Sequence, residues 1–426
     1  MQTINNYSKK FSSVNNIGNF ISKIIFYVCI VFFFHKSFII LEIRRNINYN
    51  SITNFGDNSK EYIIDENLYW NNQTSLNIDN IIKEIKYFNK EIYFERKTDF
   101  EKRENPKISI VITLHNNEIN IKSIYASIQK QELKDLEIIF VDDDSKDNTY
   151  KIINELMDKD KRIVYLKNDI NRRAFYSRNR GILNSTGEYV ICIDPDDLLV
   201  NNILIKAFET AKKYDLDIVH FYALKGTYEA PKLWKNLKGK GGILKNNSEI
   251  RDNFYHCISR SLWDKLVKTN IFKESINYMK KEFYNELYYI NNDDTAFFGL
   301  LHTARTYGFL EQIGYFYISR PTGAYYYRTD PKNMNLIFRS IFNNMKYFYI
   351  QSDNNTIEKS FLAYNYFEKG MRLFEKYLPN VTIGFDYFFE ILDLYLNSSY
   401  FNFTQKSKIY YYKLIFTDRK EKINNN

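Results

Sequence analysis

Short apolar runs alternate with helix-like segments over the middle of the chain. The runs occupy residues 108–114, 136–141, 162–166, 189–193 and 217–221. Between them, apolar residues recur three and four positions apart, as at Ile121, Ile124 and Ile128, which is typical of helices that bury one face. Strands that are apolar throughout and alternate with such helices predict an α/β fold, in which a mostly parallel sheet is covered by helices on both faces.

The N-terminal region contains an apolar run of its own, Ile24–Phe34, which extends back to Ile17 with polar interruptions. As a helix, residues 17–34 would reach roughly 27 Å, enough to cross the hydrocarbon core of a bilayer. No small-residue cleavage site follows, so an anchor within residues 17–41 is preferred to a cleaved signal or a buried helix. The sequence therefore predicts a single-pass membrane protein, of the Golgi or ER in a eukaryote. Its topology stays open because basic residues flank both ends of the run.

The composition and the hydrophobic pattern of the rest of the chain change twice. Residues 42–105 are polar and rich in asparagine, and we interpret them as a stem with one helix near residues 78–90. Residues 106–330 carry the pattern of strands and helices and are expected to form the main domain. Residues 331–426 are rich in aromatic residues at helical spacing, which predicts a C-terminal helical extension.

Charge and cysteine content narrow the function classes. The chain has 60 lysine and arginine residues against 51 aspartate and glutamate residues, a net charge of +9. The basic residues are scattered, without zinc-finger spacing or a basic helix with heptads, so no nucleic-acid partner is expected. A membrane surface or a small anionic substrate fits this charge better. Three cysteines without a CxxC pair exclude a disulfide framework.

Two of the predicted strands end in acidic clusters, Asp142–Asp144 and Asp194–Asp197. The carboxyl ends of parallel strands share one edge of the sheet, where ligands bind in open α/β folds. Residues two apart in an extended segment face the same side, so Asp194 and Asp196 should aim at one point, with Pro195 turned away. Two carboxylates suit Mg²⁺ or Mn²⁺, although each cluster alone also fits a turn or a helix cap.

Further candidates for chemistry lie beside these clusters. Asn292-Asp293-Asp294 precedes an apolar helical pattern, as either a helix cap or a base that accepts a proton from a hydroxyl. Arg172–Gly181 contains four arginines, which would either neutralise a diphosphate or form a solvated helix face. Several other kinds of active site are not indicated, because the chain has no GxxxxGK[ST], no GxGxxG after the first strand, no GxSxG and no HExxH.

In their order and spacing, these motifs resemble glycosyltransferase family 2, which has the GT-A fold. Ile108–Glu118 resembles the first strand and loop of the family, and Leu136–Ser145 resembles its second strand. Asp144 stands where the family usually has glycine. Arg178–Gly181 is similar to the run that leads into the family's DxD motif, which is Asp194-Pro195-Asp196 here.

The second half of the resemblance, which covers roughly residues 106–330, has fewer matching motifs. Leu262–Leu266 looks like the acceptor-side segment, in which Trp263 would either stack on a sugar or fill the core. Asp293-Asp294 looks like the family's ED motif, with aspartate in place of glutamate. The QxxRW motif of processive members is absent after Asp294, which favours the addition of one sugar at a time.

The resemblance implies a role for each matching residue. A nucleotide-sugar, with UDP as the expected nucleotide, would be held by Thr113, Glu118, Asp142, Asp143 and Asp194. Asp194 and Asp196 would bind a divalent cation, Mn²⁺ or Mg²⁺, with Asp197 and Arg178 in support. Asp294, or alternatively Asp293, would deprotonate the acceptor hydroxyl, which then attacks the anomeric carbon with inversion.

We therefore expect a membrane-anchored, metal-dependent glycosyltransferase that adds a hexosyl or N-acetylhexosaminyl group to a carbohydrate-bearing acceptor. The acceptor would be a glycan, a glycolipid or a glycoprotein. One alternative is a nucleotidyltransferase that makes an activated sugar, but this needs a glycine-rich basic loop that His115–Glu118 does not provide. The other is a non-catalytic, carbohydrate-binding membrane protein with the same fold.

Overall fold

The computed structural model describes residues 78–88, 104–200, 202–234, 242–254, 260–279, 292–320, 334–352, 363–377 and 385–424. The predicted membrane segment 17–41 lies outside these residues, as does most of the predicted stem. The helix expected near residues 78–90 is present as α3 (Ile78–Phe88). The boundaries drawn between stem, main domain and extension stay predictions.

The predicted membrane localisation needs a correction. Across the described ranges, no helix is both long and apolar enough to cross a membrane. The longest of them, α13 (Met334–Gln351) and α17 (Phe403–Asn424), carry polar and charged residues along their length, whereas a span needs about 20 mostly apolar residues. The single-pass membrane localisation predicted from the sequence is therefore wrong for the described part of the chain.

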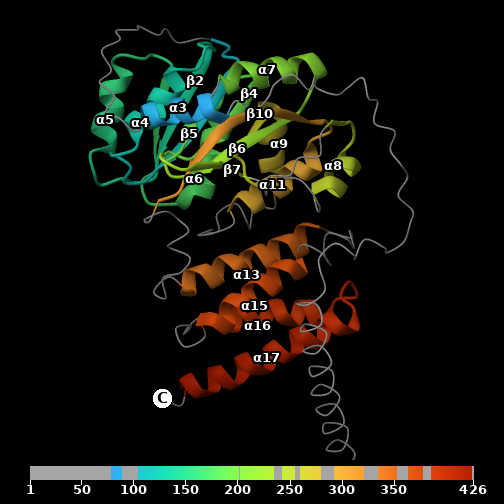
Figure 1. Ribbon diagram of the computed structural model, residues 1–426. Coiled ribbons are helices and arrows are strands. Elements are labelled where there is room, and N and C mark those ends of the chain that lie inside the picture. Colours follow the sequence, from blue (N-terminus) through green and yellow to red (C-terminus); the bar gives the residue numbers. More distant parts are fainter. Residues whose placement is uncertain are drawn as a thin grey trace, which may run out of the picture. The chain divides into compact units, whose positions relative to one another are not determined.

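The described residues form one mixed sheet of ten strands (Figure 1). The strands are β1 (Ile108–Leu114), β2 (Leu136–Asp142), β3 (Ile163–Lys167), β4 (Tyr189–Ile193), β5 (Leu198–Leu199), β6 (Ile218–Gly226), β7 (Pro231–Leu233), β8 (Ile243–Leu244), β9 (Lys265–Lys268) and β10 (Tyr307–Ile318). Their order is β3-β2-β1-β4-β9-β6-β10-β5, with β7 beside β6 and β8 beside β10. Since β9 is antiparallel to both β4 and β6, the strands β1, β2, β3, β4, β6 and β10 all run in one direction. This confirms the predicted mostly parallel sheet.

Helices cover both faces of the sheet, as predicted. In this part of the chain they are α4 (Ile121–Gln129), α5 (Thr149–Met157), α6 (Arg173–Asn184), α7 (Ile203–Tyr214), α8 (Asn247–Phe254), α9 (Thr269–Tyr278) and α11 (Asn292–Thr303). Ile110 and Ile112 of β1 belong to the same buried cluster as residues of α4 and α7. Val111 between them belongs to another cluster, which contains residues of α6, α9 and α11. This division follows from the alternation of side chains along a strand.

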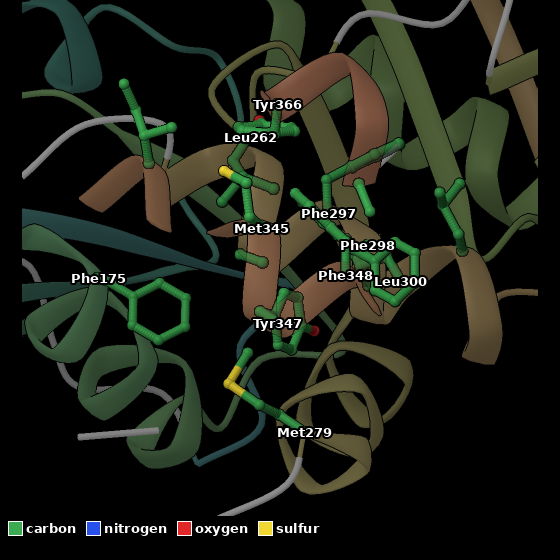
Figure 2. Close-up of a cluster of buried hydrophobic side chains, with 14 of the residues drawn as sticks. Phe175, Leu262, Met279, Phe297, Phe298, Leu300, Met345, Tyr347, Phe348 and Tyr366 are labelled. Carbon is green, nitrogen blue, oxygen red and sulfur yellow. The ribbon is translucent and has the colours of Figure 1, made fainter. Parts of the chain in front are cut away.

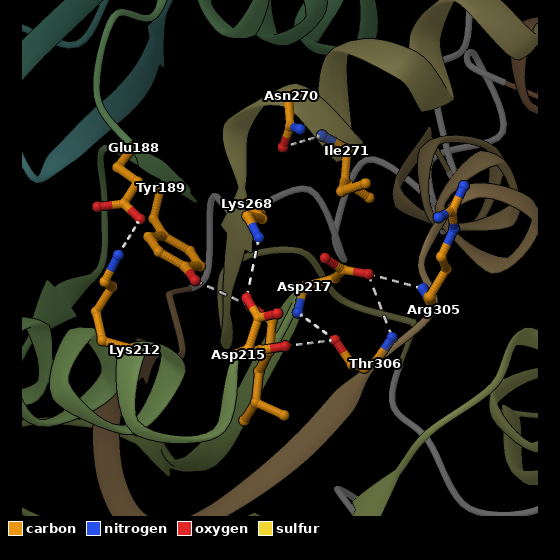
Figure 3. Close-up of polar contacts among 11 residues, drawn as sticks. Glu188, Tyr189, Lys212, Asp215, Asp217, Lys268, Asn270, Ile271, Arg305 and Thr306 are labelled. Atoms are coloured by element: carbon orange, nitrogen blue, oxygen red, sulfur yellow. Dashed lines mark hydrogen bonds and ion pairs between the residues drawn. The ribbon is translucent and has the colours of Figure 1, made fainter.

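The edge of the sheet at which β4, β6 and β10 begin is held together by polar contacts (Figure 3). A carboxylate oxygen of Asp217 accepts hydrogen bonds from the backbone N–H groups of Arg305 and Thr306, at 2.8 and 3.2 Å. The Tyr189 hydroxyl donates to the carbonyl oxygen of Leu216 at 3.1 Å. The opposite edge, at which β1, β2 and β4 end, is therefore where the acidic clusters lie.

Helices α13, α15 (Tyr364–Tyr377), α16 (Phe385–Asn397) and α17 follow the sheet in the sequence, and α13 packs on α11 (Figure 2). Phe298 of α11 makes edge-on contacts with Tyr347 and Phe348 of α13, with ring centroids 5.5 and 5.1 Å apart. The Thr295 hydroxyl donates a buried hydrogen bond of 2.6 Å to the Asn344 side chain. Most residues of α11 are buried, because sheet-side helices and α13 cover different faces of it.

Candidate active site

The acidic ends of β2 and β4 flank β1 at the same edge of the sheet. Asp142 closes β2 and lies beside Leu114, the last residue of β1. On the other side of β1, Ile193 ends β4 opposite Ile112, and Asp194 follows it. The order of strands changes direction around β1, and such a switch point is where open α/β sheets bind ligands.

Asp142 and Asp143 are buried and hold the loops around them. Asp142 accepts hydrogen bonds from the Ser145 N–H group (2.8 Å) and the Tyr165 hydroxyl (2.6 Å). Asp143 accepts one from the Asn168 side-chain amide at 2.7 Å. It also accepts two from the backbone N–H groups of Arg172 and Arg173 at 2.7 and 2.6 Å, where α6 begins. Their contact with a nucleotide stays a prediction.

Asp144 occupies a left-handed backbone conformation, with φ of 63°. This explains how the chain forms a turn in which family 2 usually has glycine, since aspartate tolerates this region better than most residues. The Asp144 carboxylate also pairs with the Lys146 ammonium at 2.6 Å, which lowers its pKa. The departure from the family pattern therefore leaves the turn in place.

Residues at the start and in the middle of helix α6 contact three segments of the site: the loop after β2, the loop after β4 and the start of α11. Its first residues are bound by Asp143, although Arg173 has the unusual φ of 69°. Five residues later, the buried Arg178 donates to the side chains of Asn292 and Asp293 at 2.7 and 2.8 Å, and lies 3.5 Å from a carboxylate oxygen of Asp194. Five residues span about 7.5 Å along a helix.

Two further observations support the view that α6 holds these three segments together. A Cβ atom at Gly181 would lie 2.4 Å from a methyl group of Val111, so glycine is needed for the close approach of α6 to β1. Burial alone would lower the pKa of Arg178, but Asp293 and Asp194 outweigh it and raise that pKa. Arg178 is therefore a fixed positive charge between the two acidic residues.

The loop Asp194–Asp197 carries two partly exposed carboxylates and one buried carboxylate. The side chains of Asp194 and Asp196 are 32% and 36% exposed. Asp196 lies 3.5 Å from the guanidinium of Arg320. Asp197 is buried and accepts hydrogen bonds from the Tyr315 hydroxyl (2.9 Å) and the Ile318 N–H group (2.8 Å). The first two carboxylates are thus placed to meet a ligand, and Asp197 supports the loop from within.

The residues present fit a divalent cation that arrives with a substrate. Partial burial of the Asp194 carboxyl raises its pKa to about 7 against the pull of Arg178, and the charges of Asp293 and Asp196 add to the rise. A cation would relieve this repulsion. In the described part of the chain, no three His, Cys, Asp or Glu residues are grouped to hold a metal. Mg²⁺ and similar ions are, however, often bound by one or two carboxylates plus water and substrate phosphates.

Asp293 and Asp294 occupy the first turn of α11, where carboxylates match the positive end of the helix dipole. Asp293 is committed to its ion pair with Arg178. Asp294, with a side chain that is 14% exposed, lies 3.8 Å from the guanidinium of Arg260. The two neighbouring carboxylates therefore have different partners. This difference distinguishes the two candidates for the base, which the sequence alone does not.

Thr113 and Glu118 lie at the end of β1 and in the loop after it. Thr113 is half-buried. Glu118 accepts hydrogen bonds from the backbone N–H and the side-chain amide of Asn148, at 2.9 and 2.8 Å. In this structure Glu118 therefore ties the loop after β1 to the loop after β2, and its predicted contact with the nucleotide stays a prediction.

The predicted acceptor-side segment lies largely inside the protein. Trp263 is only 5% exposed, stacked on Tyr315 on one side (centroids 4.6 Å apart) and on Trp234 on the other (5.4 Å). Of the two roles predicted for Trp263, the structure places it in the core. Sequence reasoning missed both Tyr315 and Arg320, and the one available signal is that Arg320 follows a strand end, as Asp194 does.

Asp264 and Lys265 of the same segment form a buried polar network with His220. The Lys265 ammonium donates to the Asp264 carboxylate at 2.6 Å, and that carboxylate lies 3.1 Å from the Nε2 atom of His220. The Tyr307 hydroxyl lies 2.6 Å from the Nδ1 atom of His220. Burial, with the nearby Lys265 charge, lowers the pKa of His220 to about 4 despite the pull of Asp264. His220 is therefore neutral at pH 7.

This network makes the stability of the fold depend on pH. The folded-state pKa of His220, about 4, lies below the ordinary value of 6.5, so the unfolded chain takes up a proton first as the pH falls. The stability that His220 contributes is present above about pH 6.5 and is lost as the pH falls towards 4. Between pH 7 and pH 5 we expect it to lower the free energy of unfolding by about 2 kcal/mol.

Urea unfolding of the wild type and of His220→Gln at both pH values measures this contribution. The variant should lose about 2 kcal/mol less than the wild type between pH 7 and pH 5, because it lacks the titrating group. Equal losses in the two proteins would show that His220 is already protonated, or exposed, in the folded state.

Comparison with known proteins gives related sequences for this part of the chain. Residues 109–268 match the family described as Glycosyl transferase family 2. The GalNAc(5)-diNAcBac-PP-undecaprenol beta-1,3-glucosyltransferase of Campylobacter jejuni is 28% identical over 231 residues, which cover 48% of this chain and 72% of that protein. The UDP-Glc:alpha-D-GlcNAc-diphosphoundecaprenol beta-1,3-glucosyltransferase WfaP of Escherichia coli is 34% identical over 110 residues, or 25% of this chain and 43% of WfaP.

Among solved structures, the chain is similar to residues 1–349 of S. aureus TarS. The TM-score is 0.47 and the sequence identity is 18%, over 68% of this chain and 80% of that one.

Proposed function

Because residues 109–268 match Glycosyl transferase family 2, we propose that this chain transfers one sugar at a time from a nucleotide-diphosphate sugar to an acceptor hydroxyl, with inversion at the anomeric carbon. The observation that carries this proposal is the position of Arg178. Its guanidinium lies between Asp194, at the end of β4, and Asp293, at the start of α11. This supports a single site in which Asp194 would serve the donor and the carboxylates at the start of α11 would serve the acceptor.

The donor would lie over the end of β4. Asp194 and Asp196 would hold a divalent cation, Mn²⁺ or Mg²⁺, which when bound offsets the negative charge on the leaving diphosphate. Arg178 keeps Asp194 in place from the buried side, and Asp197 fixes the loop through Tyr315 and Ile318. These contacts hold the donor carboxylates in position before the substrate arrives, so little reorganisation is needed during the reaction.

Asp294 would be the general base. Its carboxylate takes the proton of the acceptor hydroxyl while the oxygen forms a bond to the anomeric carbon. The bond between that carbon and the diphosphate breaks in the same step, and the diphosphate leaves with the electron pair. Asp293 is unsuited to this task because its carboxylate is engaged in an ion pair with the Arg178 guanidinium at 2.8 Å.

The names of the relatives guide the choice of substrates. WfaP is named for UDP-Glc and for an acceptor linked to diphosphoundecaprenol, and the Campylobacter relative is also a glucosyltransferase acting on a PP-undecaprenol compound. We therefore propose a UDP-hexose donor, with UDP-glucose as the first candidate. The proposed acceptor is a carbohydrate linked to a lipid diphosphate, within the wider class of carbohydrate-bearing acceptors.

A donor screen tests this function. The protein is incubated with UDP-, GDP- and dTDP-sugars in the presence of Mn²⁺, and thermal unfolding and nucleotide release are measured. A UDP-sugar at 100 times its dissociation constant should stabilise the fold by about 2.7 kcal/mol. UDP should be released when an acceptor is added. Failure of every UDP-sugar to stabilise the protein, or release of pyrophosphate from UTP and a sugar phosphate, would contradict the proposal.

A further inference from the structure

The hydroxyl group of Tyr315 lies directly behind the DxD loop. Tyr315 belongs to β10 and is fully buried. Its hydroxyl oxygen accepts a hydrogen bond from the backbone N–H of Asp194 at 3.1 Å, and its proton is donated to the Asp197 carboxylate at 2.9 Å. One phenol therefore holds the first and the last residue of the loop that carries Asp194 and Asp196.

Strand β10 supports this loop at further points. The second oxygen of the Asp197 carboxylate accepts the N–H of Ile318 at 2.8 Å. The Asp197 N–H group donates back to the carbonyl oxygen of Asp194 at 3.2 Å. Beyond the loop, β5 pairs with β10 in antiparallel register, with Leu199 opposite Tyr315. The curvature of the loop is therefore set by β10, which is far from it in the sequence.

The position of the phenol is itself fixed by aromatic packing. The ring of Tyr315 stacks on Trp263 with an interplanar angle of 18°, and Trp263 stacks in turn on Trp234. Because Trp263 is buried, the phenol cannot swing away from the loop without displacing the indole. The hydroxyl is thus held by a part of the core that contains none of the acidic residues of the site.

We propose that Tyr315 is a positioning residue that sets the spacing of the Asp194 and Asp196 carboxylates for a divalent cation. This inference rests on the proposed function, because it assumes a cation at these two residues. Without the hydroxyl, the Asp194 N–H and one Asp197 oxygen lose a buried partner, so the loop relaxes. Contacts of this kind behind a metal ligand typically change metal affinity by 10- to 100-fold.

The test compares Tyr315→Phe with Tyr189→Phe. Tyr189 is a buried tyrosine at the opposite end of β4, and its hydroxyl also donates one hydrogen bond, to a backbone carbonyl. Mn²⁺ binding is measured by titration with and without donor, thermal unfolding is recorded, and kcat is measured over a range of Mn²⁺ concentrations. We expect Tyr315→Phe to weaken Mn²⁺ binding by about 10- to 100-fold, with kcat largely restored at saturating Mn²⁺. Tyr189→Phe should lower stability and leave Mn²⁺ affinity unchanged.

Failure of this inference can be told apart from failure of the proposed cation site. If the wild type binds Mn²⁺, Asp196→Ala does not, and Tyr315→Phe binds as well as the wild type, the role of Tyr315 is overturned. If the wild type binds no Mn²⁺ with or without donor, the cation site fails and the inference fails with it. Should Tyr315→Phe not fold, Trp263→Phe replaces it, because it loosens the stack and keeps the hydroxyl. Unchanged Mn²⁺ affinity in Trp263→Phe would then overturn the inference.

Discussion

Replacing Asp196 by alanine is expected to lower kcat/KM for sugar transfer by at least about 1,000-fold, equivalent to about 4 kcal/mol of transition-state stabilisation. Asp196 is one of the two partly exposed carboxylates of the DxD loop. Without it, the cation loses a ligand and the leaving diphosphate loses charge compensation. Its ion pair with Arg320 is partly exposed and 3.5 Å long, so the fold should lose less than about 1 kcal/mol.

The measurement is steady-state transfer with Mn²⁺ and the donor found in the screen, together with a thermal unfolding curve. Asp158→Ala is the matched control, because Asp158 is an exposed carboxylate at the end of α5 that lies outside the proposed site. The control should transfer sugar at the wild-type rate. An Asp196→Ala protein with full activity and a normal unfolding curve would disprove the assignment of the DxD loop.

Asp294→Asn is expected to lower kcat by about 100- to 10,000-fold, the usual contribution of a general base. The amide keeps the shape of the side chain and can no longer accept the proton of the acceptor hydroxyl. Donor binding should change little, because Asp294 lies beside Arg260, whereas Asp293 is the residue that pairs with Arg178 next to Asp194. Single-turnover transfer and donor titration separate the two quantities.

Asp293→Asn provides the contrast to this variant. It removes the negative charge that pairs with Arg178 at 2.8 Å, so its effect should fall on donor binding as well as on turnover. If Asp294→Asn retained normal turnover while Asp293→Asn lost it with donor binding unchanged, the base would have to be reassigned to Asp293.

The strands that carry the site could be predicted because most of their residues are apolar, with few polar interruptions such as Ser109 and Glu137. The observed β1 and β4 have the predicted bounds, and β2 is longer by Asp142, which pairs with Leu114. The bounds of these strands depend on neighbours in the sequence. The segment Asp194–Asp197 is a turn, closed by the hydrogen bond from the Asp197 N–H to the Asp194 carbonyl oxygen at 3.2 Å, and not the extended segment that the sequence leads us to expect.

Other parts depend on distant partners and leave no local signal. Strand β9 begins and ends with lysine, and its pattern does not indicate a buried strand. It is one because Asp264 neutralises Lys265 and because β4 and β6 pair with its two sides. Likewise, the hydroxyl that holds Asp197 comes from a tyrosine 118 residues away, on β10. Such pairings are fixed by tertiary packing, which a single sequence does not reveal.

The packing of α11 against α13 has a consequence for how much of the chain the enzyme needs. Helix α11 carries the proposed base, and the same helix buries Phe298 against Tyr347 and Phe348. A shortened protein ending at residue 330 would expose this aromatic surface to water, at about 1.5–3 kcal/mol for Phe298 alone. It would also remove Asn344, which accepts a hydrogen bond from Thr295, the residue next to Asp294. Helix α13 therefore supports α11 on the side away from the sheet, and truncation is expected to displace the proposed base from the proposed donor site.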